Sequence, residues 1–188
     1  MKILGIMGSP RLKGNTDLLL DETLKGAQNA GAAIEKIIVS KLNIAPCKEY
    51  NTCIRDGKCA IRDEMNDIYP KLLEADAIIV ASPIFFYGVT SQLKALIDRC
   101  QALWARKYIL KQTLSYPGRK GAFLAVGATS GEKLFDGCLL TMKYFFQAVD
   151  VDYTDNLLIR GIDKKGEITE HPTALPDAFE LGKKLAQQ

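Results

Sequence analysis

The sequence predicts an α/β fold in which a parallel sheet of five strands lies between two layers of helices. Short apolar runs alternate with segments of helical periodicity along the whole chain. The middle runs are apolar without polar alternation, as expected for strands buried on both faces of a parallel sheet. The lengths of these alternating segments suit a three-layer α/β sandwich.

Five apolar runs are expected as strands. They are residues 3–7, 34–39, 77–81, 121–126 and 157–159. The segments between them place apolar side chains on one face at helical spacing. The expected helices contain residues 17–24, 65–72, 93–104, 134–146 and 175–185.

Composition narrows the class of protein. The 188 residues suit one domain over 1–188, and 47% hydrophobic with 25% charged residues is typical of a soluble globular protein. A net charge of +3 is too small for a nucleic-acid footprint. Neither a signal peptide nor an apolar stretch of the roughly 20 residues that span a bilayer is recognisable. We therefore expect a cytoplasmic protein without nucleic-acid or membrane partners, whose five cysteines are thiols or metal ligands.

The segment after the first strand, Gly-Ser-Pro-Arg-Leu-Lys-Gly-Asn-Thr over residues 8–16, predicts a phosphate site. A strand that turns sharply into a helix directs unpaired backbone N–H groups at one point, with the helix dipole behind them. Side-chain donors, one cation and a glycine that permits close approach add to this. The candidate phosphate ligands are Ser9, Arg11, Gly14, Asn15 and Thr16.

Other phosphate loops do not match this segment. A Walker A motif needs a lysine where Asn15 stands and is one residue shorter between its glycines. A dinucleotide fingerprint needs an acidic residue at the end of the second strand, and none is present there. A cysteine phosphatase needs a thiol in the loop, whereas the first cysteine is Cys47. A monophosphate site without a nucleophile is left, with an ordinary capped helix as the alternative.

The motif Gly-Ser-Pro-Arg-x-x-Gly-Asn-Thr resembles the NAD(P)H-dependent FMN reductase family, and within it the branch of iron–sulfur flavoproteins. The resemblance covers nearly the whole chain because two further segments match. It implies a flavodoxin-like fold with strand order 2-1-3-4-5 and bound FMN. In that order the loops after strands one and three flank one crevice.

The second matching segment follows the third strand and reads Ser-Pro-Ile-Phe-Phe-Tyr-Gly-Val over residues 82–89. The family pattern is Ser-Pro-apolar-Tyr-Phe, so phenylalanine stands here where tyrosine is usual. The resemblance implies that this loop meets the flavin ring, whereas the alternative for its aromatic residues is ordinary core packing. The residues concerned are Pro83, Ile84, Phe85, Phe86, Tyr87 and Gly88.

The third matching segment, residues 127–132, is small and polar and follows the fourth strand. In relatives this loop forms the far wall of the flavin site, which implies roles for Ala128, Thr129 and Gly131. A plain turn before a helix is the alternative.

A connection over residues 40–63 is long for an α/β protein and carries Cys47, Cys53 and Cys59. The iron–sulfur branch has C-x2-C-x2-C-x5-C here, giving four thiolates for a [4Fe–4S] cluster. In this chain Tyr50 stands at the second cysteine position. The loop is therefore a cluster-free element that shapes the flavin pocket or a subunit interface, a cluster site with one non-cysteine ligand, or a set of reactive thiols or ligands for another metal. Cys100 and Cys138 lie in apolar helical stripes and are expected in the core.

The resemblance implies an oxidoreductase in which FMN takes electrons from NADH or NADPH and passes them to a small molecule or a redox protein. No catalytic side chain is expected, because the cofactor carries the chemistry. One alternative is an electron carrier like the iron–sulfur flavoproteins, working with ferredoxin-type partners. Another is a non-redox phosphate or nucleotide sensor. The resemblance also implies a homodimer or homotetramer, in which a neighbouring subunit helps to cover the flavin.

Overall fold

The computed structural model describes residues 1–187. It contains one five-stranded sheet of order β2-β1-β3-β4-β5 in which all neighbouring strands are parallel, and this confirms the expected strand order. The strands are β1 (Lys2–Met7), β2 (Ala33–Ile38), β3 (Ala77–Pro83), β4 (Lys120–Val126) and β5 (Asp152–Ile159).

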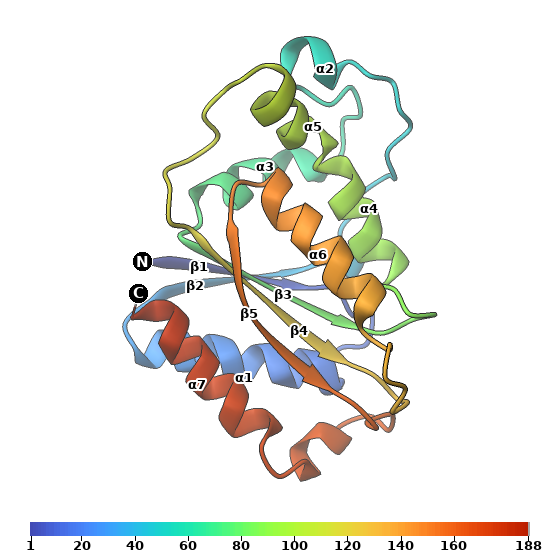
Figure 1. Cartoon of the computed structure of the whole chain (residues 1–188), viewed down its shortest axis with the longest axis vertical. Coiled ribbons are helices and arrows are strands. Elements are labelled where there is room, and N and C mark those ends of the chain that lie inside the picture. Colours follow the sequence, from blue (N-terminus) through green and yellow to red (C-terminus); the bar gives the residue numbers. More distant parts are fainter. Residues whose placement is uncertain (188) are drawn as a thin grey trace.

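Helices cover both faces of the sheet, as the alternating sequence pattern predicts. Helices α1 (Asn15–Asn29) and α7 (Ala174–Ala186) lie on one face, and α3 (Met65–Glu74), α4 (Ser91–Arg99) and α6 (Asp136–Ala148) lie on the other (Figure 1). Successive residues of β1 and β3 point alternately into two cores, because side chains of a strand alternate between its faces. Leu4 and Val80 belong to the core under α3, α4 and α6, whereas Ile3 and Ile79 belong to the core under α1 and α7.

Strand β5 begins five residues before the expected start at residue 157. Its first part, residues 152–156, alternates exposed and half-buried positions. This edge strand pairs only with β4, so it does not need the continuous apolar sequence that marks the inner strands.

The helix expected over residues 93–104 is interrupted. Helix α4 ends at Arg99, α5 (Gln101–Trp104) follows Cys100, and a π-helical turn, η2 (Ala105–Ile109), continues it. Helix α6 begins at Asp136, so Leu134 lies in the preceding turn although it is buried. Apolar periodicity marks buried positions but does not distinguish a regular helix from a turn that buries the same side chains.

Helices α1 and α7 approach each other through two glycines. A Cβ atom at Gly182 would lie 1.8 Å from the carbonyl oxygen of Thr23, and one at Gly26 would lie 2.0 Å from that of Phe179. No larger residue fits at either position without moving a helix. This contact fixes α1, whose first turn forms part of the site described below.

The remaining short elements are η1 (Val39–Lys41), α2 (Cys53–Asp56) and η3 (Glu167–Glu170). Within residues 1–187, every helix is too short or too polar to cross a lipid bilayer.

Candidate functional site

A cleft of about 200 Å³ opens beside the carboxyl ends of β1, β3, β4 and β5. In a parallel sheet of this order, β1 and β3 are the neighbours whose connections leave in opposite directions, and ligands bind at that place. The cleft brings together residues from all three segments that the sequence singles out. It is lined by Ser9, Pro10, Arg11, Gly14, Asn15, Thr16, Pro83, Ile84, Phe85, Val126, Ala128, Ile162 and Asp163.

The first turn of α1 presents free donors to this cleft. The helical bonding begins with the N–H of Leu18, which donates to the Gly14 oxygen at 3.0 Å, and no side chain caps the helix. The N–H groups of Asn15, Thr16 and Asp17 therefore have no helical acceptor. Such a group of N–H donors with a helix dipole behind it suits an anion, and phosphate in particular.

The loop before α1 is held by its own hydrogen bonds. Ser9 Oγ accepts from the N–H of Arg11 at 3.1 Å, and Asp17 Oδ2 accepts from the N–H of Lys13 at 2.7 Å. Lys13 has a φ of 53°, a left-handed conformation that the Asp17 contact stabilises. A Cβ at Gly14 would lie 3.0 Å from the Arg11 oxygen, so the loop is as tight as the sequence motif predicts.

The acidic residue in this turn is neutralised. Lys36 Nζ lies 2.5 Å from Asp17 Oδ1 and 2.5 Å from Asp21 Oδ1. Burial lowers the pKa of Lys36, but its hydrogen bonds to Asp17 and Asp21 outweigh this and raise the pKa above its usual value. The Asp17 carboxylate is nearly buried, and its pairing with an ammonium group limits repulsion of an anion in the cleft.

Asn15 differs from its expected role as a side-chain donor to the phosphate. Its Nδ2 donates to the Lys164 oxygen at 2.9 Å, and its Oδ1 accepts from the N–H of Ile168 at 3.2 Å. The amide is thus engaged by a segment about 150 positions away in the sequence, which the local motif does not reveal. Its backbone N–H stays among the free donors of α1.

The loop after β3 contributes only its first part to the cleft. Pro83, Ile84 and Phe85 line it, whereas Phe86, Tyr87 and Gly88 do not. Phe85 and Gly88 exchange two backbone hydrogen bonds of 2.9 Å around Phe86 and Tyr87, whose φ angles are 48° and 61°. These angles correspond to a type I′ turn, which normally carries asparagine or glycine. The side chain of Phe86 is completely exposed.

The outer part of this turn rests on α6. Cys138 Sγ contacts the Tyr87 oxygen at 3.7 Å, and a Cβ at Gly137 would lie 2.7 Å from that oxygen. At the base of the turn, Thr90 Oγ1 donates to the Gly8 oxygen at 2.6 Å and so ties this loop to the phosphate loop. The loop is positioned from both sides, and the Phe86 side chain at its tip is exposed and does not line the cleft.

The loop after β4 also contributes less than expected. Ala128 lines the cleft, whereas Thr129 and Gly131 do not. The Thr129 oxygen instead accepts from the N–H of Gly161 at 3.4 Å. In this way the loop supports the segment after β5, and that segment supplies Ile162 and Asp163, two cleft residues that the sequence reasoning missed. Their position after the last parallel strand is the signal that could have indicated them.

The three loop cysteines lie around a second cleft, of about 410 Å³. Burial and the nearby Cys59 and Cys47 thiols raise the pKa of Cys53. Tyr50 lines the same cleft and is largely exposed. Three thiols and a phenol do not match the four thiolates of a [4Fe–4S] cluster. Nor does any set of three or more His, Cys, Asp or Glu side chains within residues 1–187 have an arrangement that could hold a metal ion.

The other two cysteines are in the core, as predicted. Cys100 and Cys138 are buried, and burial raises the pKa of Cys138 to about 11. Burial raises the pKa of Cys100 as well. Neither thiol is therefore available as a thiolate near neutral pH.

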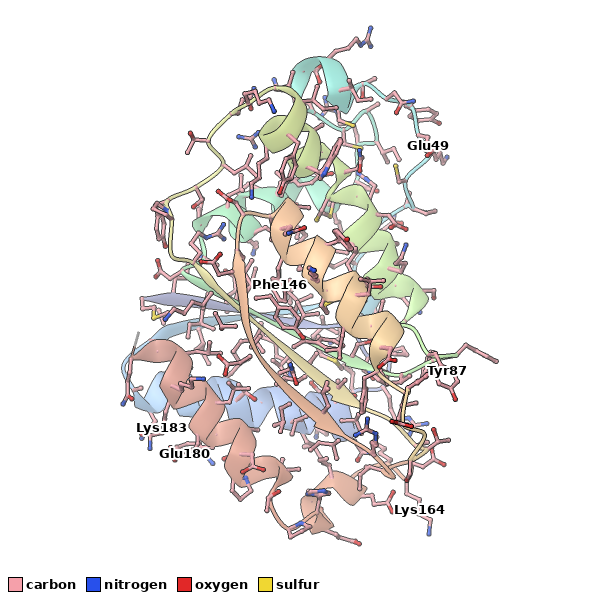
Figure 2. The ribbon with its side chains drawn as sticks, in the orientation of Figure 1. Glu49, Tyr87, Phe146, Lys164, Glu180 and Lys183 are labelled. Atoms are coloured by element: carbon pink, nitrogen blue, oxygen red, sulfur yellow. The ribbon has the colours of Figure 1, made fainter. Side chains whose placement is uncertain are left out.

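The two clefts lie in different parts of the molecule. In Figure 2, Glu49 of the cysteine loop lies apart from Tyr87 and Lys164, which belong to the loops after β3 and β5. None of the three loop cysteines lines the cleft at the phosphate loop.

Comparison with known proteins identifies the family of the chain. Residues 1–149 match the family model of NADPH-dependent FMN reductase. An iron–sulfur flavoprotein of Methanocaldococcus jannaschii is 34% identical over 195 residues, covering 100% of this chain and 96% of its own. A putative NAD(P)H-dependent FMN-containing oxidoreductase of Bacillus subtilis is 26% identical, with 98% of each chain covered.

A solved structure shows the same fold. The NAD(P)H:quinone oxidoreductase of Methanothermobacter marburgensis superposes with a TM-score of 0.75 at 16% identity, covering 98% of each chain. The family match, which spans the phosphate loop and both neighbouring cleft loops, decides the assignment. The chain belongs to the NADPH-dependent FMN reductase family and is an FMN-containing oxidoreductase.

Proposed function

We propose that FMN binds in the cleft beside β1 and β3 with its phosphate at the first turn of α1. The observation that supports this most strongly is the set of free N–H groups at Asn15, Thr16 and Asp17, beside which Arg11 also lines the cleft. The apolar stretch from Pro83 to Phe85 lies across the same cleft and suits the flavin ring. FMN has a phosphate at one end and an apolar ring at the other. These two ends match the N–H donors of α1 and the apolar residues after β3.

When bound, FMN accepts hydride from NADH or NADPH and passes electrons to an acceptor. The residues of the chain bind and orient the cofactor. Backbone N–H groups and Thr16 hold the phosphate, and Ile84 and Phe85 shield one part of the ring from water. The cofactor carries the redox chemistry, so we assign no acid–base residue to the chain.

The size of the cleft supports an open flavin site. Its volume of about 200 Å³ is below the roughly 300–1,000 Å³ of typical ligand pockets, so part of the FMN ring stays uncovered. The uncovered part leaves room for a nicotinamide and then for a small-molecule acceptor or a redox protein. We further propose a homo-oligomer in which a second subunit covers part of the ring. The completely exposed Phe86, which follows the cleft residue Phe85 in the loop after β3, supports this.

An electron carrier is the second candidate. It is supported by the relative named iron–sulfur flavoprotein and by the three thiols around one cleft. The two candidates differ in whether NADH or NADPH reduces the bound flavin: a reductase is reduced by one of them, whereas a carrier is reduced by neither. Iron and sulfide analysis of anaerobically purified protein tests the cluster, and fewer than about three irons per chain excludes an intact [4Fe–4S] centre.

The proposed site is tested by titrating the apoprotein with FMN and following flavin fluorescence. We expect Thr16→Val and Arg11→Ala to weaken FMN binding about tenfold each, because each removes a donor or charge from the phosphate. Lys111→Ala, an exposed cation outside the cleft, is the control and should bind as the wild type does. Rapid loss of the oxidised flavin band with NADPH supports the reductase, and no loss with either nicotinamide favours the carrier.

A further inference from the structure

The segment from Gly161 to Ile168 forms a wall of the FMN cleft that lies outside the residues matched to the family. It supplies Ile162 and Asp163 to the cleft lining, whereas the family match ends at residue 149. Gly161 and Gly166 have φ angles of 73° and 84°, so the backbone turns sharply at both ends of the segment.

Two sets of hydrogen bonds hold the wall from outside the cleft. At its front, the N–H groups of Gly161 and Ile162 donate to the oxygens of Thr129 and Gly127 at 3.4 and 3.1 Å. At its rear, Glu167 Oε2 accepts from the N–H groups of Asp163 and Lys164, both at 2.8 Å. These bonds shape the wall, but none of them connects it to the phosphate loop.

Asn15 supplies that connection. Its amide donates to the Lys164 oxygen and accepts from the N–H of Ile168, so both ends of the amide contact the wall. Asn15 is 8% exposed, and Ile168 is completely buried, which makes this contact an internal one. The same residue carries one of the free backbone N–H groups of α1. Asn15 thus connects the phosphate end of the cleft to the wall that lines the side of the cleft.

We propose that Asn15 is a positioning residue for the cofactor, and that its side chain acts on the middle of FMN through Ile162 and Asp163 instead of contacting the phosphate. This inference rests on the proposed FMN site. The ribityl chain between phosphate and ring carries hydroxyl donors, and the Asp163 carboxylate is an acceptor on the adjacent wall. Asn15 holds this acceptor at a constant distance from the phosphate loop.

Riboflavin separates the two possible roles of Asn15, because it has the ring and ribityl chain of FMN and lacks the phosphate. A side chain that acts through the wall affects both ligands equally. A side chain that contacts the phosphate affects FMN alone. Thr16→Val provides the reference for a phosphate contact, since Thr16 lies in the first turn of α1 and lines the cleft.

The experiment measures the dissociation constants of apoprotein variants for FMN and for riboflavin by fluorescence quenching. We expect Asn15→Ala to weaken both about tenfold and to leave their ratio unchanged, whereas Thr16→Val weakens FMN alone. Asp163→Ala should weaken both ligands too. In the double variant of Asn15→Ala and Asp163→Ala, the loss of affinity should be smaller than the product of the two single losses, because both residues act through the same wall.

A second variant covers the case in which Asn15→Ala does not fold. Glu167→Ala removes the rear support of the wall without touching the cleft, and it should also weaken both ligands by an equal factor. Glu170→Ala in the same short helix η3 is the matched control, because Glu170 is exposed and outside the wall contacts; it should bind both ligands as the wild type does.

Loss of FMN affinity alone in Asn15→Ala would assign the side chain to the phosphate and overturn the proposal. Unchanged affinity for both ligands in Asn15→Ala, or in Glu167→Ala where the first variant does not fold, would also overturn it. Wild-type protein that binds neither ligand would refute the proposed FMN site itself, which distinguishes that failure from a failure of the role of Asn15.

Discussion

Asp63 and Arg99 form a bidentate ion pair with N–O distances of 2.7 and 3.1 Å, and both side chains are almost inaccessible to solvent. Arg99 also donates to the oxygens of Ala45 and Ile61 at 2.8 and 3.3 Å. These acceptors lie near the two ends of the cysteine-containing connection over residues 40–63. A single guanidinium group on α4 therefore joins the two ends of this connection.

We expect Arg99→Lys to destabilise the protein by about 1.5–3 kcal/mol, because lysine keeps the charge but does not reproduce the forked hydrogen bonds to a buried carboxylate. The opened connection should also expose its thiols, so Cys53 and Cys59 should react faster with a thiol reagent. Urea unfolding and labelling followed by mass spectrometry measure the two effects.

The control for this variant is Lys94→Gln on the same helix. Lys94 pairs with Asp98 at 2.6 Å, but both side chains are exposed, so the loss should stay within about 0.5 kcal/mol. Equal stability and equal thiol reactivity in Arg99→Lys and Lys94→Gln would show that the ion pair does not close the connection.

The same pair predicts a dependence of stability on pH. Burial raises the pKa of Asp63, but hydrogen bonds from Arg99 and from the N–H groups of Ala45 and Met65 outweigh it and hold the pKa below its usual value. A carboxyl whose pKa is lower in the folded state stabilises the protein fully above its unfolded pKa, near 4, and loses that contribution as pH falls through the folded pKa.

Urea unfolding at a series of acidic pH values tests this coupling. The wild type should lose stability with a steeper slope below about pH 4 than Asp63→Asn, which has no proton to bind at this position. Parallel slopes for the two proteins would assign the acid sensitivity to other carboxyl groups.

Gly182→Ala is expected to cost about 2–4 kcal/mol of unfolding free energy, because the added Cβ would lie 1.8 Å from the Thr23 oxygen and force α7 away from α1. Gly131→Ala is the control. A Cβ there would find its nearest neighbour, Tyr87 Oη, at 3.7 Å, so we expect a change within about 0.5 kcal/mol. Thermal unfolding of both variants measures the difference, and equal melting temperatures would contradict the close helix contact.

Phe86→Gly should leave the isolated subunit as stable as the wild type or up to about 1 kcal/mol more stable. Phe86 is completely exposed and has a φ of 48°, so glycine removes left-handed strain and sacrifices no core contact. The same change should weaken oligomerisation if this side chain meets a second subunit. Thermal unfolding and sedimentation of one preparation measure both, and a large loss of monomer stability would disprove the strain argument.

Local sequence patterns determined the α/β class and the phosphate loop. The inner strands are continuous apolar runs because both of their faces are buried. The apolar character of each residue indicates this burial without knowledge of the residues that it contacts. The segment over residues 8–16 is likewise local, since a helix start and the loop before it lie together in the sequence. Its lining residues were predicted for this reason. The strand order 2-1-3-4-5 came from the family resemblance and is confirmed.

Only the tertiary structure decided what the Asn15 amide contacts and which residues complete the cleft. Its amide bonds reach Lys164 and Ile168, 149 and 153 positions along the chain, so no local pattern encodes them. The tip at Phe86 points outward because paired backbone hydrogen bonds close the turn beneath it. Sequence periodicity reports burial and local conformation, whereas the direction of a loop and the partner of a buried amide depend on how distant segments pack.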